Sequence, residues 1–183
     1  MSYDKRTSGQ RDYSILVIDP PWKFASNSAA KPARNAMRHY PCMTDAEIAS
    51  IPVEQIAAKH ALLFLWVTVP ILDRAMAIPP LWGFRYISSF VWPKGRIATG
   101  YWIRNQHELC LLYKRGRFPR PDAKAPFKTS LISGAVREHS RKPEHLQDEI
   151  DRIWPSARKL EMFARQTRLG WDVVGNEIER FNR

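Results

Sequence analysis

Residues 15–22 read ILVIDPPW, an apolar run that ends in an acidic, proline-rich turn. A short, β-branched run closed by two prolines predicts a buried strand whose carboxyl end opens into Asp19. In open α/β sheets, ligands bind beyond that end of the strands. We therefore expect the rest of the chain to be arranged around this turn.

The turn itself, Asp19-Pro20-Pro21-Trp22, also predicts a chemistry. Its prolines fix two φ angles and remove two backbone donors, which leaves the carbonyls of Asp19 and Pro20 as outward acceptors beside the carboxylate. Trp22 is expected to add a flat apolar surface at the same rim. Several acceptors beside an aromatic plate suit a planar base that carries an exocyclic amine. The alternative is an ordinary strand end with a core tryptophan.

Length and composition favour one folded domain over residues 1–183. The hydrophobic content is 44%, with seven tryptophans, which is enough for a packed core. No run reaches the ~18 apolar residues of a membrane span, and the polar N-terminal segment lacks the apolar part of a signal peptide. We therefore expect a cytoplasmic protein.

Cysteine usage predicts no metal site. Cys42 and Cys110 are far apart in the sequence and lack the spacing of metal ligands. His107, Glu108 and Cys110 are close in sequence, but alternation along a strand places Glu108 and Cys110 on one face and His107 on the other. We expect two small, partly buried thiols.

The charge balance favours a polyanionic partner. The chain has 29 basic and 18 acidic residues, a formal net charge of +11. Lysines and arginines that neutralise phosphates release condensed counterions, which favours binding to nucleic acid. Charge alone does not distinguish DNA from RNA.

Apolar runs and turn residues predict alternating strands and helices, which is typical of an α/β fold. Thr44 and Glu47 have the spacing of a capping box, Pro52 begins a second helical turn, and Pro143 begins a longer helix. We expect a helix over 70–76 that is broken at Pro79-Pro80, and further strands over 61–67, 84–92, 108–113, 159–164 and 172–174.

Three basic segments, at about 23–38, 94–105 and 114–128, are predicted to be mobile loops. The first is expected to be a lid beside the catalytic turn, or else a solvated linker. The second interleaves cations and aromatic rings, which suits single-stranded or flipped nucleic acid, although an oligomer contact is the alternative. The third has six cations, one acid and two phenylalanines and is expected to be a second phosphate-binding arm. The predicted nucleic-acid-binding residues are Lys23, Lys94, Arg96, Arg104, Asn105, His107, Lys114, Arg115 and Arg117.

The sequence resembles the adenine N(6)-methyltransferases typified by the messenger-RNA adenosine methyltransferase catalytic subunit and its bacterial and phage DNA-modifying relatives. The Asp-Pro-Pro-Trp turn is the family's signature, and further segments follow in the family's order over nearly the whole chain. These segments are His39-Tyr40-Pro41-Cys42-Met43-Thr44, Leu63-Phe64-Leu65-Trp66-Val67-Thr68, Trp82-Gly83-Phe84, Val91-Trp92-Pro93-Lys94, His107-Glu108-Leu109, Arg141-Lys142-Pro143, Lys159-Leu160-Glu161-Met162-Phe163-Ala164-Arg165, Gly170-Trp171 and Gly175-Asn176-Glu177.

The resemblance implies a Rossmann-like sheet that binds S-adenosylmethionine, with a permuted motif order in which the catalytic turn precedes the cofactor segments. By matching positions, Asp19, Pro20, Pro21 and Trp22 form the catalytic turn. Lys142 is implied to lie by the methionine carboxylate of the cofactor. The groups around the ribose are implied to be Glu161, Arg165, Asn176 and Glu177.

The sequence departs from the messenger-RNA enzymes at two places near the implied cofactor site. Gln166-Thr167 stands where those enzymes have Pro-His, and Glu177 stands where they have Gln. A segment upstream of the first motif holds the cofactor adenine in the family, and this chain starts too late to show it. We therefore make no prediction of how the adenine is held.

The predicted function is methyl transfer from S-adenosylmethionine to the exocyclic N(6) amine of adenine in nucleic acid. DNA is preferred because the compact chain resembles the bacterial and phage DNA-modifying members. The alternatives are an RNA adenine methyltransferase and a catalytically silent nucleic-acid-binding subunit of a homo- or hetero-oligomer. No Gly-x-Gly-x-x-Gly or P-loop motif occurs, which weighs against a dinucleotide cofactor and nucleotide hydrolysis.

Overall fold

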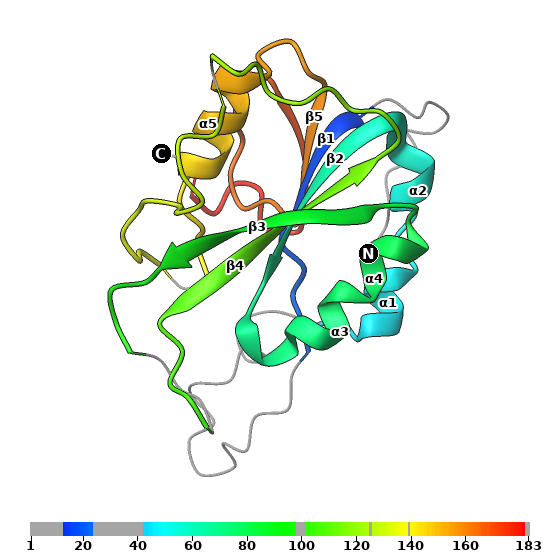
Figure 1. The fold of residues 1–183 in the computed structure, drawn as a ribbon. Helices are drawn as coiled ribbons and strands as arrows, with labels where there is room; N and C mark the ends of the chain where they lie inside the picture. Colours follow the sequence, from blue (N-terminus) through cyan, green and yellow to red (C-terminus); the bar gives the residue numbers. More distant parts are fainter. Residues whose placement is uncertain (1–12, 24–41, 98–101, 125, 139, 182–183) are drawn as a thin grey trace.

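The strand that precedes Asp19 lies inside a six-stranded sheet in the computed structural model, which describes residues 13–23, 42–97, 102–124, 126–138 and 140–181 (Figure 1). The strand order is β3-β4-β2-β1-β5-β6. The strands are β1 (Tyr13–Ile18), β2 (Ala57–Val67), β3 (Arg85–Pro93), β4 (His107–Arg115), β5 (Lys159–Met162) and β6 (Trp171–Val174). The predicted α/β fold is confirmed.

Strand directions decide which residues meet at the edge of the sheet. β1 pairs in parallel with β2 and β5, and β5 pairs in parallel with β6. β4 runs antiparallel to β2 and β3, so β4 begins at the edge where β1 and β2 end. Asp19, directly after β1, and Glu108, near the start of β4, therefore come to the same edge although they are far apart in sequence.

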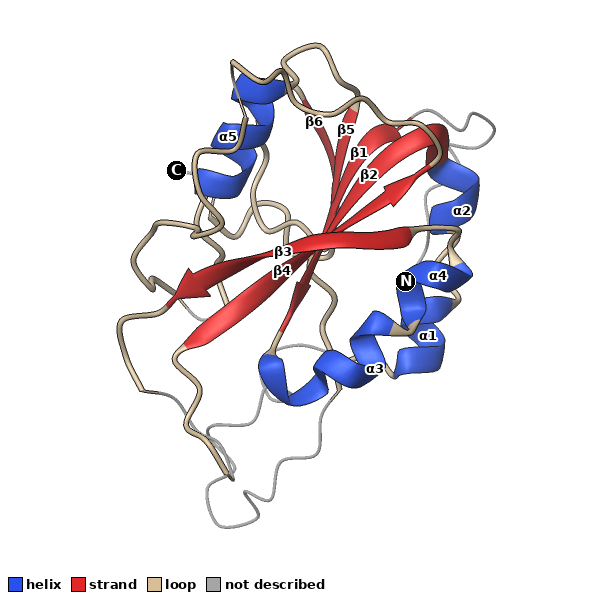
Figure 2. Ribbon diagram, in the orientation of Figure 1, coloured by secondary structure: helices blue, strands red, loops and turns tan. Residues whose placement is uncertain are grey.

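Helices cover both faces of the sheet (Figure 2). One face packs against α1 (Asp45–Ala49), α2 (Val53–Ile56), the 3₁₀ helix η5 (Val69–Ile71), α3 (Leu72–Met76) and α4 (Ile78–Leu81), and the other against α5 (His145–Ile153).

The central strand β1 is buried on both sides because its side chains alternate between two cores. Leu16 and Ile18 join the core under α1 to α4, whereas Ile15 and Val17 join the core under α5. All four side chains are fully buried. A continuous apolar run is typical of a strand covered on both faces, and the predicted strand is confirmed.

Local helix signals in the sequence are partly confirmed. The backbone N–H of Glu47 donates to the Thr44 hydroxyl at 3.3 Å, and the backbone N–H of Thr44 donates to Glu47 Oε2 at 2.7 Å. These two bonds form the predicted capping box at the start of α1. The predicted helix over 70–76 is confirmed by η5 and α3, but the break lies at Ala77 and not at Pro79-Pro80. α4 contains both prolines in its first turn, where a missing N–H breaks no helical hydrogen bond.

The structure also corrects the prediction that 114–128 forms a free basic arm. Lys114 and Arg115 belong to β4. Phe118 and Phe127 lie edge-on to Trp154, with ring centroids 5.6 Å and 5.7 Å away, and cover the core under α5. The aromatic contacts hold this segment on the protein, because edge-to-face rings add to the apolar area that they bury.

Among the described residues, no helix combines the length and the apolar character needed to cross a membrane.

The packing of the 116–128 segment predicts a measurable loss of stability when its aromatic contacts are removed. We expect Phe127→Ala to lower the free energy of unfolding by about 2 kcal/mol, because the ring is partly buried against Phe64, Phe90 and Trp154. Urea unfolding followed by tryptophan fluorescence measures this change. Leu169→Ala, at a side chain that is 99% exposed, is the control and should change stability by less than about 0.5 kcal/mol. An equal change in the free energy of unfolding for the two variants would mean that the 116–128 segment is not held by these aromatic contacts.

Candidate active site

A solvent-open pocket lies at the edge where β1 and β2 end and β4 begins. Its empty volume is about 350 Å³. Acidic, basic and aromatic side chains from four separate parts of the chain share it, so no single motif makes the site. The lining residues are Asp19, Pro20, Trp22, Trp66, Val67, Thr68, Glu108, Ser140 and Lys142.

Charges of alternating sign cross the pocket. Lys142 Nζ donates to Asp19 Oδ2 at 2.7 Å and lies 3.5 Å from Glu108 Oε2. The other oxygen of Glu108 forms an ion pair with Lys94. Burial alone would raise the pKa of Glu108, but Lys142 and Lys94 together hold that pKa below its usual range. Each carboxylate of the pocket is thus in contact with a lysine.

Asp19 keeps one oxygen for a ligand. Its Oδ2 is bound by Lys142, and within the described part of the chain no group donates a hydrogen bond to its Oδ1. The carboxylate remains about a quarter exposed, at 25%. A fixed and partly exposed carboxylate oxygen can accept an N–H group from a molecule in the pocket.

The Pro20 carbonyl was predicted to be a free outward acceptor, but it already accepts one hydrogen bond within the protein. It accepts the Trp22 amide at 2.8 Å, which closes a tight turn, and Pro20 is buried. A carbonyl has two lone pairs, so one acceptor position remains. The Pro21 carbonyl accepts from the Met43 amide at 2.8 Å, which ties the catalytic turn to the residues before α1.

The structure corrects the prediction that Trp22 presents an open plate at the rim. Trp22 is 5% exposed, and its Nε1 donates to the Trp66 carbonyl at 3.0 Å. The side chain joins the core under α1 to α4, because a ring this large is stabilised most by burial when its N–H finds a partner. Trp66 is 1% exposed and also lines the pocket.

The predicted cofactor residues fall into two groups. Lys142 lies in the pocket, and Glu161 on β5 is near enough to Asp19 for the two charges to interact. Arg165 forms an ion pair with Glu177 at 3.3 Å, so the segments after β5 and β6 are joined there. Asn176 is exposed.

Glu161 has an unusual environment on the side of β5 that faces α5. Burial raises the pKa of Glu161, the hydrogen bond from Gln147 opposes that shift and the charge of Asp19 adds to it, so the pKa lies at about 7. Gln147 Nε2 donates to Glu161 Oε1 at 3.3 Å, while the buried Gln147 Oε1 has no partner among the described residues. Such groups suit a ligand that bears hydroxyls, so these residues fit the ribose of a nucleoside cofactor.

The predicted nucleic-acid-binding residues do not form one surface. The Lys94 side chain forms an ion pair with Glu108 at the pocket. Its backbone N–H donates to the Gln106 carbonyl at 2.7 Å, which joins the residue after β3 to the residue before β4. Asn105 and His107, near the start of β4, are partly buried. Lys23, Arg96 and Arg104 are exposed, and Ala98 to Tyr101 and the predicted lid from Phe24 to Arg38 lie outside the described residues.

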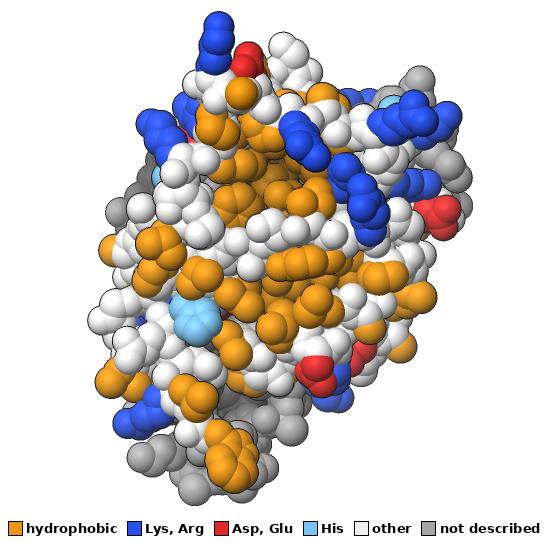
Figure 3. Space-filling view, in the orientation of Figure 1, with side chains coloured by type: hydrophobic (Ala, Val, Ile, Leu, Met, Phe, Trp, Pro, Cys, Tyr) orange, Lys and Arg blue, Asp and Glu red, His pale blue; other side chains and the backbone are white. Residues whose placement is uncertain are grey.

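Lys114, Arg115 and Arg117 lie at the opposite end of β4. Lys114 is six residues beyond Glu108, which corresponds to about 20 Å along a strand. Arg115 is occupied, since its Nη1 donates to the Glu54 carbonyl at 2.9 Å. Figure 3 shows Lys and Arg side chains gathered at the upper right, where β3 starts and β4 ends. Sequence reasoning had no means to separate these cations from those at the pocket.

Glu108 is the pocket residue that sequence reasoning missed. Its sequence predicts a strand position and a segment that resembles the family, but no role in the pocket. The predicted alternation is confirmed, since Glu108 and Cys110 are both buried. Its position between Lys94 and Lys142 follows from strand order, which the local pattern does not contain. No cluster of three or more metal-binding side chains occurs in the described parts of the chain.

An α/β sheet with a polar pocket beyond the carboxyl ends of its central strands defines the class of Rossmann-like enzymes that bind nucleotide-bearing cofactors. Within that class the chain belongs to the MT-A70 family, whose match spans residues 13–177.

Two kinds of relatives are similar to this chain. It is 29% identical over 185 residues to the type II methyltransferase M.MunI of a Mycoplasma species, with 92% of this chain and 79% of that protein covered. It is 30% identical to a putative N(6)-adenosine-methyltransferase MT-A70-like protein of Medicago truncatula and 28% identical to the human N(6)-adenosine-methyltransferase catalytic subunit METTL3. Those alignments cover 91% of this chain but only 26% and 28% of the plant and human proteins.

The environment of Glu161 predicts a pH dependence of stability. Because its folded-state pKa of about 7 exceeds the ordinary value of 4.5, its stabilising contribution is complete below about pH 4.5 and is lost as pH rises through 7. We expect Glu161→Gln to unfold at higher urea concentration than the parent at pH 8, by up to about 3 kcal/mol, with the gain shrinking towards pH 5. The exposed Glu179→Gln is the control. A gain that is independent of pH would contradict the assignment.

Proposed function

We propose that this chain transfers a methyl group from S-adenosylmethionine to the N(6) amine of adenine in DNA. The observation that supports this most directly is the Asp19 carboxylate, fixed at the mouth of the pocket by Lys142 at 2.7 Å with Oδ1 left as an acceptor. The chain belongs to the MT-A70 family, whose match spans residues 13–177 and so includes this turn.

The chemical difficulty is the weak nucleophilicity of the adenine amine, whose lone pair is delocalised into the ring. Acceptors at Asp19 Oδ1 and at the second lone pair of the Pro20 carbonyl bind the two N–H groups and favour a pyramidal nitrogen. That geometry returns the lone pair to nitrogen and aims it into the pocket. Holding the reacting atoms about 3 to 3.5 Å apart supplies much of the rate by orientation.

S-adenosylmethionine, when bound, supplies a methyl group on a positively charged sulfur. That chemistry would join the methyl carbon to the amine nitrogen while the bonding pair of the broken S–C bond left with sulfur. The amine then loses one proton, for which the Asp19 carboxylate is the adjacent acceptor. No step needs a nucleophilic side chain, in keeping with the buried Cys110, whose thiol pKa burial raises well above its usual value.

The residues proposed to hold the cofactor surround the same edge of the sheet. Lys142, which donates to Asp19 and to the Ser140 carbonyl and lies beside Glu108, is proposed to face the carboxylate of the cofactor. Glu161 and Gln147 are proposed to meet the ribose hydroxyls. Arg165 and Glu177 are proposed to close the site from the other side, because their ion pair joins the two segments that follow β5 and β6.

Similarity to a bacterial type II methyltransferase supports DNA as the substrate. The chain is 29% identical to M.MunI over 185 residues. RNA is the second candidate, because the relatives named N(6)-adenosine-methyltransferases are equally similar over this domain. The intact contact between Asp19 and Lys142 argues against a catalytically silent subunit.

Two basic surfaces are proposed to bind phosphates. The first borders the pocket and comprises Lys23, Lys94, Arg96, Arg104, Asn105 and His107. The second, which we call the distal basic surface, lies at the far end of β4 and comprises Lys59, Arg85, Lys114 and Arg117. Arg85 and Lys114 are paired across β3 and β4, and the Arg117 amide donates to His60 beside Lys59 at 3.0 Å. No acidic side chain among the described residues forms an ion pair with these four cations.

Transfer of labelled methyl groups tests the proposed reaction. We expect N(6)-methyladenine in a mixed-sequence DNA pool, identified after digestion to nucleosides, and less or none in a matched RNA pool. Asp19→Asn should lower the rate by about 10² to 10⁴, because it removes a preorganised contact of the transition state, while calorimetry still detects cofactor binding. Label found only in RNA would select the second candidate. An active Asp19→Asn enzyme would contradict the role of the carboxylate.

The distal basic surface predicts a change in the salt dependence of DNA binding. For Arg85→Gln combined with Arg117→Gln, the slope of log affinity against log salt should fall by about 1.8, as for two lost phosphate contacts. Lys124→Gln combined with Lys128→Gln removes the same charge from exposed positions outside this surface and is the control. Equal slopes for the two double variants would remove the distal basic surface from the interface.

A further inference from the structure

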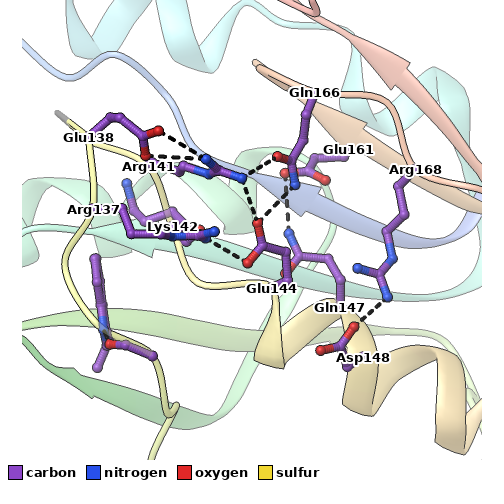
Figure 4. A network of polar contacts seen from close by, with 12 residues as sticks. Arg137, Glu138, Arg141, Lys142, Glu144, Gln147, Asp148, Glu161, Gln166 and Arg168 are labelled. Carbon is purple, nitrogen blue, oxygen red and sulfur yellow. Dashed lines mark hydrogen bonds and ion pairs between the residues drawn. The ribbon is translucent and has the colours of Figure 1, made fainter. Parts of the chain in front are cut away.

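A network of polar contacts centres on Arg141, the residue before Lys142 (Figure 4). Arg141 Nη1 donates to both carboxylate oxygens of Glu138, at 3.1 Å and 3.2 Å. Its Nη2 donates to Glu144 and to Gln166, each at 3.2 Å, and its guanidinium lies 4.7 Å from the ring centroid of Phe181. One side chain therefore joins the segment before α5 to the segments after β5 and β6.

Gln166 and Glu144 close the network. Gln166 Nε2 donates to the same Glu144 oxygen that Arg141 binds, at 3.2 Å. Arg137 Nη2 donates to the other oxygen of Glu144 at 2.6 Å and to the backbone carbonyl of Lys142 at 3.1 Å. Both oxygens of Glu144 and the backbone of Lys142 are thus fixed. Burial would raise the pKa of Glu144, but the bonds from Arg137 and Gln166 lower it to about 2, so the network keeps its charge at neutral pH.

The backbone beside Arg141 needs such support. Ser140 has a φ of 62°, a left-handed conformation that a non-glycine residue adopts at a cost. This turn sends consecutive side chains to different places. Arg141 enters the network with Glu138 and Glu144, whereas Lys142 enters the pocket, where Nζ meets Asp19. If the turn relaxes, the ammonium group of Lys142 moves away from Asp19.

We propose that Arg141 is a positioning residue that fixes the turn before α5 and thereby presents Lys142 to Asp19 and to the cofactor carboxylate. The inference rests on the proposed function only in assigning those roles to Lys142. The partners of the Arg141 side chain among the described residues are Glu138, Glu144, Gln166 and Phe181, none of which lines the pocket, so Arg141 acts through its neighbour Lys142.

The partner of Arg141 on the β5 side is Gln166. Gln166 is one of the positions at which the sequence departs from the messenger-RNA enzymes, and it follows directly after Arg165. Through Gln166, Arg141 holds the Lys142 side of the cofactor site at a fixed distance from the Arg165 side. A cofactor that spans both sides should therefore bind to a preorganised site.

A double-mutant cycle in the full-length chain tests the inference. We expect Arg141→Gln to weaken S-adenosylmethionine binding in calorimetry about tenfold and to lower kcat for methyl transfer about 10- to 100-fold, because the misplaced Lys142 loses its contacts. Lys142→Met should cause a similar loss. In the Lys142→Met background, Arg141→Gln should change the affinity less than about twofold, since the group it positions is already absent.

Control variants separate positioning from stability. Arg152→Gln removes an arginine that is paired with Glu149 on α5, outside the pocket and the network, and should leave affinity and kcat unchanged. Arg141→Lys keeps the charge but not the forked contacts and should lose affinity partly. It also replaces Arg141→Gln in the cycle if that variant does not fold.

The outcomes distinguish the inference from the proposed function. Parent protein that neither binds S-adenosylmethionine nor transfers methyl groups would refute the proposed function. Active parent protein with an equally active and tightly binding Arg141→Gln variant would overturn the inference alone. Losses that multiply in the double variant would also overturn it, because Arg141 would then act independently of Lys142.

Discussion

The contact between Lys142 and Asp19 is the interaction on which the site depends, since it joins residues 123 positions apart across the edge of the sheet. Asp19 is placed by the end of β1, and Lys142 is placed by the turn that precedes α5. With side chains only 11% and 25% exposed, neither charge is stable there without the other. The end of β1, the turn before α5 and the network around Arg141 together hold Asp19 and Lys142 in contact.

The charge of the chain as a whole differs from the charge inside the pocket. The whole chain is strongly basic, at +11, which favours a polyanion over its surface. The pocket, in contrast, alternates lysines and carboxylates, so each acceptor is neutralised before a ligand arrives. The ammonium group of Lys142 thus offsets the charge of the Asp19 carboxylate in a partly buried site, while the chain as a whole stays basic.

Sequence reasoning succeeded where the information was local and failed where it depended on distant partners. The run before Asp19, the capping box at Thr44 and the α/β alternation were all predicted correctly, because each follows from side-chain type at fixed spacing. Trp22 was predicted to be an open plate and Phe118 and Phe127 were placed on a free arm. All three contribute to a core whose other residues come from elsewhere in the chain.

The sequence by itself determined the α/β class, the position of the catalytic turn and, through its resemblance, the family. Those features need only apolar periodicity, proline geometry and motif order. The tertiary structure alone shows that Lys142 contacts both Asp19 and Glu108 and that Arg141 contacts Gln166. It also shows that Lys114 lies at the other end of β4, about 20 Å from Glu108 along the strand. Strand order and direction decide these distances, because hydrogen-bonded neighbours in a sheet need not be neighbours in sequence.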